Sequence, residues 1–122
     1  MVQSKPDNNA IRLQVVFFRI ESGNEPVREW LKSLSQEDKR IIGEDIKTVQ
    51  FGWPLGMPVV RNIGPGFWEV RSRLVDRIAR ILFTVEAGKM VRLHGFIKKS
   101  EKTPLDDLNL ARRRLAQLRG RK

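Results

Sequence analysis

Cationic side chains recur at alternate positions in two stretches of the sequence. The positions that would share a face are Glu69, Arg71 and Arg73 in 67–73 and Arg92, His94, Phe96 and Lys98 in 89–98, with Arg77 or Arg80 nearby. Alternate side chains of a strand point to the same face, so several cations would converge on one side of a sheet. Such crowding is costly unless an anion binds there or carboxylates lie among the cations. The pattern predicts a phosphate-binding face, and the alternative is a set of solvated side chains on a half-exposed sheet.

The chemistry open to such a face is cleavage of RNA by its own 2′-OH group. This attack needs help for the 2′-OH to lose its proton, cations for the phosphate oxygens, and a proton donor for the departing 5′-oxygen. Arginine suits the phosphate because its planar guanidinium holds two oxygens. His94, the only histidine of the chain, suits proton transfer, and the alternative is a structural residue. Lys98 and Lys99, crowded by other cations, also fit the proton transfer.

The composition excludes several other kinds of site. The chain has no cysteine and no tyrosine, so disulfides, zinc-thiolate sites, cysteine nucleophiles and phenol chemistry are excluded. A single histidine excludes a multi-histidine metal site. We therefore expect no metal and no small-molecule cofactor. The longest apolar run, 15–18, is far too short to span a bilayer and follows no signal-peptide pattern, so we expect a cytoplasmic protein without membrane contact.

The excess positive charge lies in the second half of the chain. Residues 1–60 hold eight Lys or Arg and eight Asp or Glu, whereas residues 61–122 hold 16 and six, which is the full net charge of +10. This asymmetry favours a polyanionic partner, nucleic acid first and an acidic protein second, over a general solubility effect. Arg112 and Arg113 lie on the polar side of the last predicted helix, where a phosphate or an acidic partner would bind; the alternative is a solvated face. Phe96 is the best candidate for stacking on a base.

The spacing of apolar residues predicts the elements that position these side chains. Two helices are expected early, one with Pro26 in its first turn and one capped by Ser35. Strands are predicted over 11–20, 59–63, 67–73, 77–86 and 89–98. Short turns join the last three strands, which implies an antiparallel meander in which Trp68 belongs to the core. A final helix is expected to begin with Thr103 as N-cap and Pro104 in its first position.

The order β-α-α-β-β-β-β-α predicts a two-layer α+β domain, with helices packed on an antiparallel sheet. The domain spans residues 11–119. We expect a flexible segment over 1–10 and a basic tail over 120–122.

Several segments of the second half carry motifs that are weak singly and more specific in combination. They are Phe67–Arg71, Arg77–Phe83, Leu93–Lys99, Lys102–Pro104 and Ala111–Arg113. Together they resemble the RelE/HigB toxin superfamily, and most closely its phage-derived HigB-like branch. The resemblance covers residues 11–119 and implies a RelE-like fold, as in microbial ribonucleases, and a toxin of a type II toxin–antitoxin pair. Members typically enter the ribosomal A site and cut mRNA without a metal.

The resemblance also implies roles for single residues. Arg71 would bind the phosphate, Arg80 would occupy the arginine position of the next strand, and Lys98 with Lys99 would face the scissile phosphate. Further RNA contacts are expected from Arg73, Arg77, Arg92, Phe96, Lys102, Arg112 and Arg113. Several members use a tyrosine near the C-terminus, which this chain lacks, so either His94 shares the proton transfer or the cations act alone. The implied partner is a small helix-turn-helix antitoxin that masks the basic face.

Two other functions fit the same residues less well. A ParE-like toxin has the same fold and inhibits DNA gyrase by binding, for which no such basic cluster with His94 is needed. A non-catalytic nucleic-acid-binding protein of phage origin would share the charge pattern without the chemistry.

Overall fold

The computed structural model of the chain describes residues 13–99 and 102–121. Its elements are β1 (Gln14–Phe17), α1 (Pro26–Lys32), α2 (Gln36–Gly52), β2 (Val60–Gly64), β3 (Phe67–Arg73), β4 (Ile78–Glu86), β5 (Lys89–Lys98) and α3 (Leu105–Gly120). This order confirms the predicted α+β fold. The predicted flexible segment 1–10 lies outside the described residues, as does the last residue of the predicted tail.

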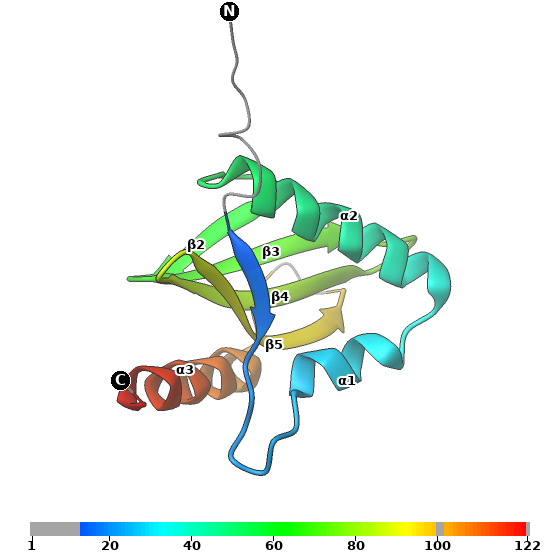
Figure 1. The fold of residues 1–122 in the computed structure, drawn as a ribbon. Helices are drawn as coiled ribbons and strands as arrows, with labels where there is room; N and C mark the ends of the chain where they lie inside the picture. The colour runs from blue at the N-terminus through cyan, green and yellow to red at the C-terminus, as the bar shows by residue number, and fades with distance from the viewer. Residues whose placement is uncertain (1–12, 100–101, 122) are drawn as a thin grey trace, which may run out of the picture.

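The five strands form one sheet in the order β1-β5-β4-β3-β2 (Figure 1). The strands β2 to β5 are antiparallel neighbours, as the short turns predicted. In contrast, β1 runs parallel to β5, with Val16 opposite Val91. A parallel pair needs a long connection, which α1 and the following elements supply. This pairing joins strands far apart in sequence, so local patterns did not reveal it.

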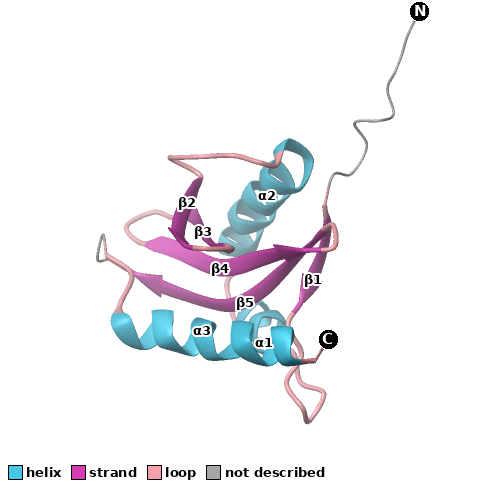
Figure 2. Cartoon of the chain, turned by 90° about the vertical axis from the view of Figure 1, so that its left-hand side faces the viewer, coloured by secondary structure: helices cyan, strands magenta, loops and turns pink. Residues whose placement is uncertain are grey.

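Helices cover both faces of the sheet. Figures 1 and 2 show α2 on one side and α3 on the other, with α3 running along β5. The small helix α1 packs against β5, where a Cβ atom on Gly95 would lie 2.4 Å from the indole of Trp30. The expected two-layer packing therefore needs refinement, because α3 adds a third layer opposite α2.

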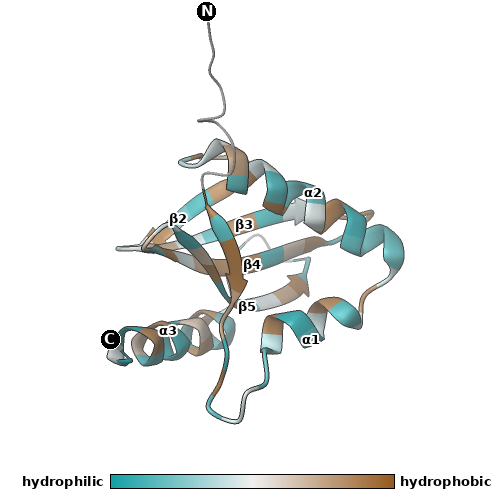
Figure 3. Cartoon of the chain, viewed as in Figure 1, coloured by the Kyte–Doolittle hydropathy of each residue, from teal (hydrophilic) through white to brown (hydrophobic). Residues whose placement is uncertain are grey.

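Each helix buries an apolar stripe against its own side of the sheet. On the α2 side, Ile42, Ile46 and Val49 pack with the alternate strand residues that include Val70 and Ile81. Trp68 also contacts this cluster, as predicted. On the α3 side, the buried residues include Ala111 and Leu115 of the helix together with Leu82 and Leu93 of the sheet. Figure 3 shows the resulting mixture of hydrophobic and hydrophilic residues along both helices. Burial of these stripes supplies the main stabilising free energy.

The two predicted helix caps differ in outcome. The Ser35 hydroxyl accepts a hydrogen bond from the backbone N–H of Asp38 at 3.1 Å, as an N-cap does. Thr103 does not cap α3, whose cap position is Pro104 without a side-chain hydrogen bond. The Thr103 hydroxyl instead donates to Glu69 of β3 at 2.6 Å. A buried carboxylate competes for this hydroxyl more strongly than a solvated helix end does.

The strand β5 contains a bulge that changes which residues share a face. Leu82 of β4 is paired with His94, whereas the next residue, Phe83, is paired with Arg92. Leu93 is the extra residue, so the alternation shifts by one position across it. As a result, Arg92 faces α2 and shares a hollow with Ile42, while His94 faces α3. The prediction that Arg92 shares a face with His94 is wrong for this reason.

Candidate nucleic-acid interface

The strand register places several predicted site residues in rows across the α3 side of the sheet. The first row is Glu69, Leu82 and His94; the second is Arg71, Arg80 and Phe96; the third is Arg73, Ile78 and Lys98. Side chains that are paired in this way point to the same face. The helix α3 packs over the first row, and the third row lies at the end of β5. The predicted convergence of cations on one face is therefore real for β3, β4 and the end of β5.

A buried carboxylate of the first row lies beside Arg71 of the second row. Glu69 has no exposed surface, and its Oε1 lies 3.8 Å from the Nε of Arg71. Its Oε2 accepts the hydrogen bond from Thr103. This arrangement offsets the cost of crowded arginines, because a carboxylate lies among them. Glu69 and Arg71 are two positions apart in β3, so they were expected on one face. That Glu69 is a buried partner of the arginines was not predicted.

Arg80 lies inside the protein. It has no exposed surface, and its neighbours across the sheet are Arg71 and Phe96. This burial keeps Arg80 away from the exposed surface, and the site role that the resemblance implies for it stays a prediction. Arg71 remains only slightly exposed, with 12% of its side chain accessible. The two arginines of the second row, Arg71 and Arg80, therefore lie beneath the exposed surface.

Phe96 is also covered. Only 6% of the residue is exposed, and its ring stacks on the His94 ring with 5.5 Å between the centroids. Stacking of Phe96 on an RNA base stays a prediction, and it would require His94 or α3 to uncover the ring. Phe96 is paired with Arg80 and shares the face of His94, which is the side that α3 covers.

Arg92 occupies a different region. It is 9% exposed, its Nε donates to the carbonyl of Val16 at 3.3 Å, and its guanidinium lies 3.6 Å from the centre of the Phe17 ring. Burial lowers the pKa of Arg92 to about 10, while the charge of Glu25 opposes this shift. These contacts correct its expected place beside His94.

The exposed cations gather at the end of β5. Arg73, Lys98, Lys99 and Lys102 are all exposed, and we call these four residues the basic strand end. Arg73 and Lys99 line a hollow of about 370 Å³ together with Arg77. Arg77 is partly engaged, because it forms ion pairs with Asp38 at 3.1 Å and with Asp76 at 3.3 Å. The basic strand end is thus a group of exposed cations, and Arg77 of the β3–β4 turn lies next to it.

His94 lies two rows away from these cations, beneath the first turn of α3. Its Nε2 is 2.7 Å from Oδ1 of Asp107, and 15% of its side chain is exposed. Burial lowers the pKa of His94, while the hydrogen bond with Asp107 acts in the opposite direction and the charge of Arg114 adds to the lowering. A neutral His94 therefore donates to the Asp107 carboxylate and joins β5 to α3. The sequence analysis did not identify Asp107 as its partner.

The arginines of α3 divide between solvent and sheet. Arg112 and Arg113 are exposed, as expected for residues on the polar side. Arg114 points to the sheet, where its Nη1 donates to the carbonyl of Leu93 at 2.8 Å. This carbonyl belongs to the bulge residue, so Arg114 satisfies a group that the irregular strand leaves available.

The described part of the chain offers no clustered metal ligands. Across residues 13–99 and 102–121, no three His, Cys, Asp or Glu side chains come together in a group that could hold a metal ion. Within the same ranges, no helix is both long and apolar enough to cross a membrane.

Comparison with known proteins adds an independent line of information. No curated protein matches the chain. The family described as "Phage derived protein Gp49-like (DUF891)" matches residues 29–116. This range begins in α1 and ends in α3, so it includes the basic strand end, the buried Glu69 and the His94–Asp107 pair. The chain therefore belongs to the phage-derived Gp49-like family, a toxin-like family related to the RelE/HigB type.

Proposed function

We propose that the protein is the toxin of a type II toxin–antitoxin pair and cleaves mRNA in the ribosomal A site without a metal. The proposal includes a cytoplasmic location, where the ribosomes are, and a helix-turn-helix antitoxin that masks the basic face. The observation that carries it is the basic strand end, in which Arg73, Lys98 and Lys99 lie on one exposed edge above the buried Glu69–Arg71 pair. Membership of a toxin-like family supports the same conclusion.

The proposed reaction is attack of the RNA 2′-OH on the adjacent phosphorus. The 2′-oxygen forms a bond to phosphorus, the bond to the 5′-oxygen breaks, and the 5′-oxygen takes up a proton. Arg73, Lys98 and Lys99 stabilise the negative charge that builds on the phosphate oxygens. Solvent water takes up the proton of the 2′-OH, and a lysine ammonium donates the proton that the 5′-oxygen takes up. Arg71 adds positive charge from below without reaching far into solvent. We assign His94 a positioning role, because its Nε2 is bonded to Asp107.

The decisive experiment uses Lys98→Ala/Lys99→Ala, because both side chains are exposed and their removal leaves the core intact. Induced expression of the wild-type chain should arrest growth, and primer extension on a translated mRNA should reveal codon-linked cuts. The double variant should reduce cleavage about 100-fold or more, since each lost cation weakens transition-state stabilisation. Arg71→Ala is a poorer choice, because it also leaves the buried carboxylate of Glu69 without its nearby cation.

The matched control is Lys39→Ala/Lys47→Ala, which removes the same charge from α2 on the other side of the sheet. This control should cut mRNA as the wild type does. Equal growth arrest by a folded Lys98→Ala/Lys99→Ala variant would contradict the placement of the site. Growth arrest without cuts, together with blocked gyrase supercoiling, would identify a ParE-like toxin instead. Harmless expression of the wild type without any RNA cleavage would contradict both toxin functions.

A further inference from the structure

A second group of cations lies at the opposite end of β5, around a hollow of about 520 Å³. Its members are Arg19, Arg28, Lys89 and Arg121, which we call the β1-end cluster. They come from the segment after β1, from α1, from the start of β5 and from the end of α3. The net charge of the first sixty residues is zero, so no charge pattern predicted that Arg19 and Arg28 belong to a basic surface.

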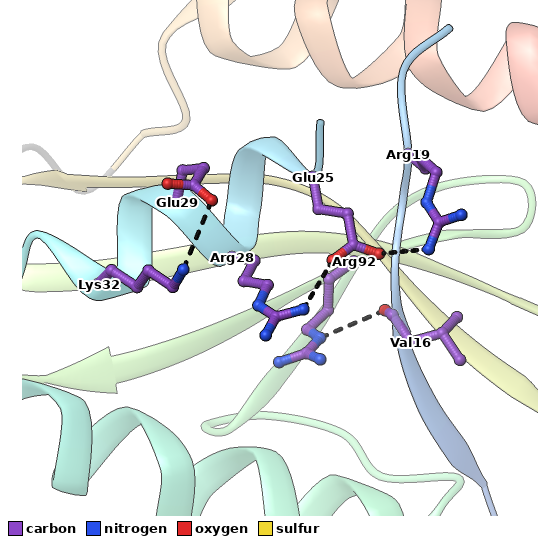
Figure 4. A network of polar contacts seen from close by, with 7 residues as sticks. All are labelled: Val16, Arg19, Glu25, Arg28, Glu29, Lys32 and Arg92. Carbon is purple, nitrogen blue, oxygen red and sulfur yellow. Dashed lines mark hydrogen bonds and ion pairs between the residues drawn. The ribbon is translucent and has the colours of Figure 1, made fainter. Parts of the chain in front are cut away.

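One carboxylate balances only part of this charge. Among the described residues that line the hollow, Glu25 is the only acidic one, and it lies between Arg19 and Arg28 (Figure 4). Arg19 Nη2 lies 3.3 Å from Oε2 of Glu25, and Arg28 Nη1 lies 3.3 Å from Oε1. A guanidinium has five N–H groups, and these contacts use one from each arginine.

Most of both arginine side chains faces solvent. Arg19 is 66% exposed and Arg28 is 56% exposed. The neighbouring carboxylate of Glu29 pairs with Lys32 at 3.7 Å, so it does not neutralise the cluster. Glu21 lines the adjoining hollow with Arg121. Positive charge therefore remains in excess around Glu25.

Guanidinium groups lie against the aromatic rings that line the hollow. Arg121, which lines the hollow itself, has its guanidinium carbon 4.9 Å from the centre of the Phe18 ring. The Phe17 ring is covered by Arg92, which lines the hollow on the α2 side instead. Phe18 is itself 1% exposed. A protein partner that inserted an apolar anchor would have to displace these cations. The surface that is ready for contact consists of guanidinium and ammonium groups, which favours a phosphate-rich partner.

The β1-end cluster and the basic strand end lie at the two ends of the same strand. A ten-residue strand such as β5 spans about 30 Å. The helix α3 runs beside β5 (Figure 2), with the exposed Arg112 and Arg113 along it and Arg121 at its end. Exposed cations of α3 therefore lie between the two ends along the chain direction of the helix, where they can contact an extended polyanion.

We propose that the β1-end cluster is a second RNA-binding site, which holds phosphates of single-stranded RNA away from the basic strand end. The site anchors RNA and takes no part in bond cleavage. Its connection with cleavage rests on the proposed function, whereas RNA binding by the cluster does not.

The test measures binding of a fluorescent 2′-O-methyl oligouridylate of about 16 nucleotides, a probe that lacks the attacking 2′-OH. Fluorescence anisotropy over a series of NaCl concentrations gives the slope of log Kd against log salt. Arg19→Gln/Arg28→Gln should weaken binding and lower this slope by about 1.4, the value for two lost phosphate contacts on a single strand. The control Lys39→Gln/Lys47→Gln removes the same charge on the α2 side and should leave the slope nearly unchanged.

A variant of opposite sign guards against a general loss of folding. Glu25→Gln removes the carboxylate that competes with phosphate for Arg19 and Arg28. It should tighten RNA binding about two- to fivefold, the range expected for one exposed ion pair. A misfolded variant would bind more weakly, so tighter binding identifies a local effect.

Three results would overturn the proposal. They are an unchanged salt slope in Arg19→Gln/Arg28→Gln, an equal loss in the α2 control, and unchanged or weaker binding in a folded Glu25→Gln variant. Cluster-dependent binding of poly-L-glutamate without RNA binding would assign the surface to an acidic protein. No ribosome and no cleavage enter this assay, so its failure is distinct from absence of mRNA cuts in cells.

Discussion

At the scale of single residues, the contact between His94 and Asp107 decides what the only histidine of the chain can do. The ring of His94 is hydrogen-bonded to this carboxylate and stacked on Phe96. Burial lowers the pKa of His94, so the ring takes up a proton less readily. A histidine placed in this way holds α3 against β5 and has little freedom to exchange protons with a substrate. This geometry is the reason for assigning His94 to positioning.

The stability of the protein should therefore fall as the pH drops through the range in which histidine titrates. The pKa of folded His94 is lowered, whereas unfolded His94 titrates near its ordinary value of about 6.5. The unfolded state thus binds more protons between these two pKa values, so the free energy of unfolding decreases as the pH falls. Urea unfolding at intervals from about pH 7.5 to about pH 5.5 should show this loss in the wild type and a smaller loss in His94→Gln.

His94 is the only histidine, so no other imidazole contributes to the difference. Carboxylates such as Glu25, whose pKa is lowered by Arg28, lose their contribution at more acidic pH. Parallel pH profiles for wild type and His94→Gln would contradict the burial of a neutral ring. A change of the cleavage pH profile in this variant, with its fold intact, would restore His94 to proton transfer.

The sequence predicted which residues of the site belong to the exposed strand end, but it did not predict which are covered. Lys98 and Lys99 follow from the end of the alternating pattern, where a strand leaves the sheet. The buried carboxylate of Glu69 is satisfied by Thr103, which lies 34 positions away in the chain. A contact over this separation leaves no periodic signal, and Thr103 before Pro104 resembles a helix cap more than a buried donor.

At the scale of elements, β5 shows how one extra residue redirects a surface. Simple alternation placed Arg92 with His94, and the bulge at Leu93 separated them. One sequence signal was available, because a glycine inside a strand often marks close approach of another element. Gly95 is such a residue, and Trp30 of α1 packs on it. The α1–β5 contact was therefore open to prediction, whereas the bulge position was not.

Gly95→Ala should test this contact directly. The added methyl group would come 2.4 and 2.5 Å from carbon atoms of the Trp30 indole, so the ring or the strand must move. We expect a loss of about 1–3 kcal/mol in the free energy of unfolding, which is the usual cost of overpacking. Chemical denaturation monitored by tryptophan fluorescence measures this loss.

Gly43→Ala on α2 is the control, because nothing lies within 4 Å of its added methyl group. An alanine in a helix should stabilise the protein by about 0.5–1 kcal/mol relative to glycine. Equal stability of the two variants would contradict the packing of α1.

At the scale of the whole molecule, the fold class was predictable because the hydrophobic periods differ clearly along the chain. The 3.6-residue period of α2 and α3 and the two-residue period of β3 and β4 each specify a buried face. Which face of the sheet each helix covers was not predictable, since both faces of β4 are buried. The parallel β1–β5 pair and the third layer depend on this choice.

The α2 side and the α3 side of the sheet also differ in how their charges are paired. On α2, Arg40 is paired with Glu37 at 2.8 Å and with Glu44 at 2.9 Å, and the chain as a whole carries +10. On the α3 side, cations accumulate at both ends of β5 with fewer carboxylates between them. The surplus charge is therefore concentrated on surfaces that we propose for RNA, where it costs stability until a polyanion binds.

The melting temperature should consequently rise as NaCl is increased from about 10 mM to about 150 mM, because the Debye length shortens from about 30 Å to about 8 Å and screens the repulsion. Surface ion pairs weaken over the same range and act against this rise, but each contributes little.

Polyuridylate at low salt should raise the melting temperature further, since a ligand that binds the folded state stabilises it. Scanning calorimetry of the wild type and of Arg19→Gln/Arg28→Gln separates the two effects. The variant should melt at a higher temperature than the wild type at low salt and gain less from polyuridylate. A melting temperature that falls with added salt would mean that ion pairs outweigh the repulsion, and the concentration of charge would then need another explanation.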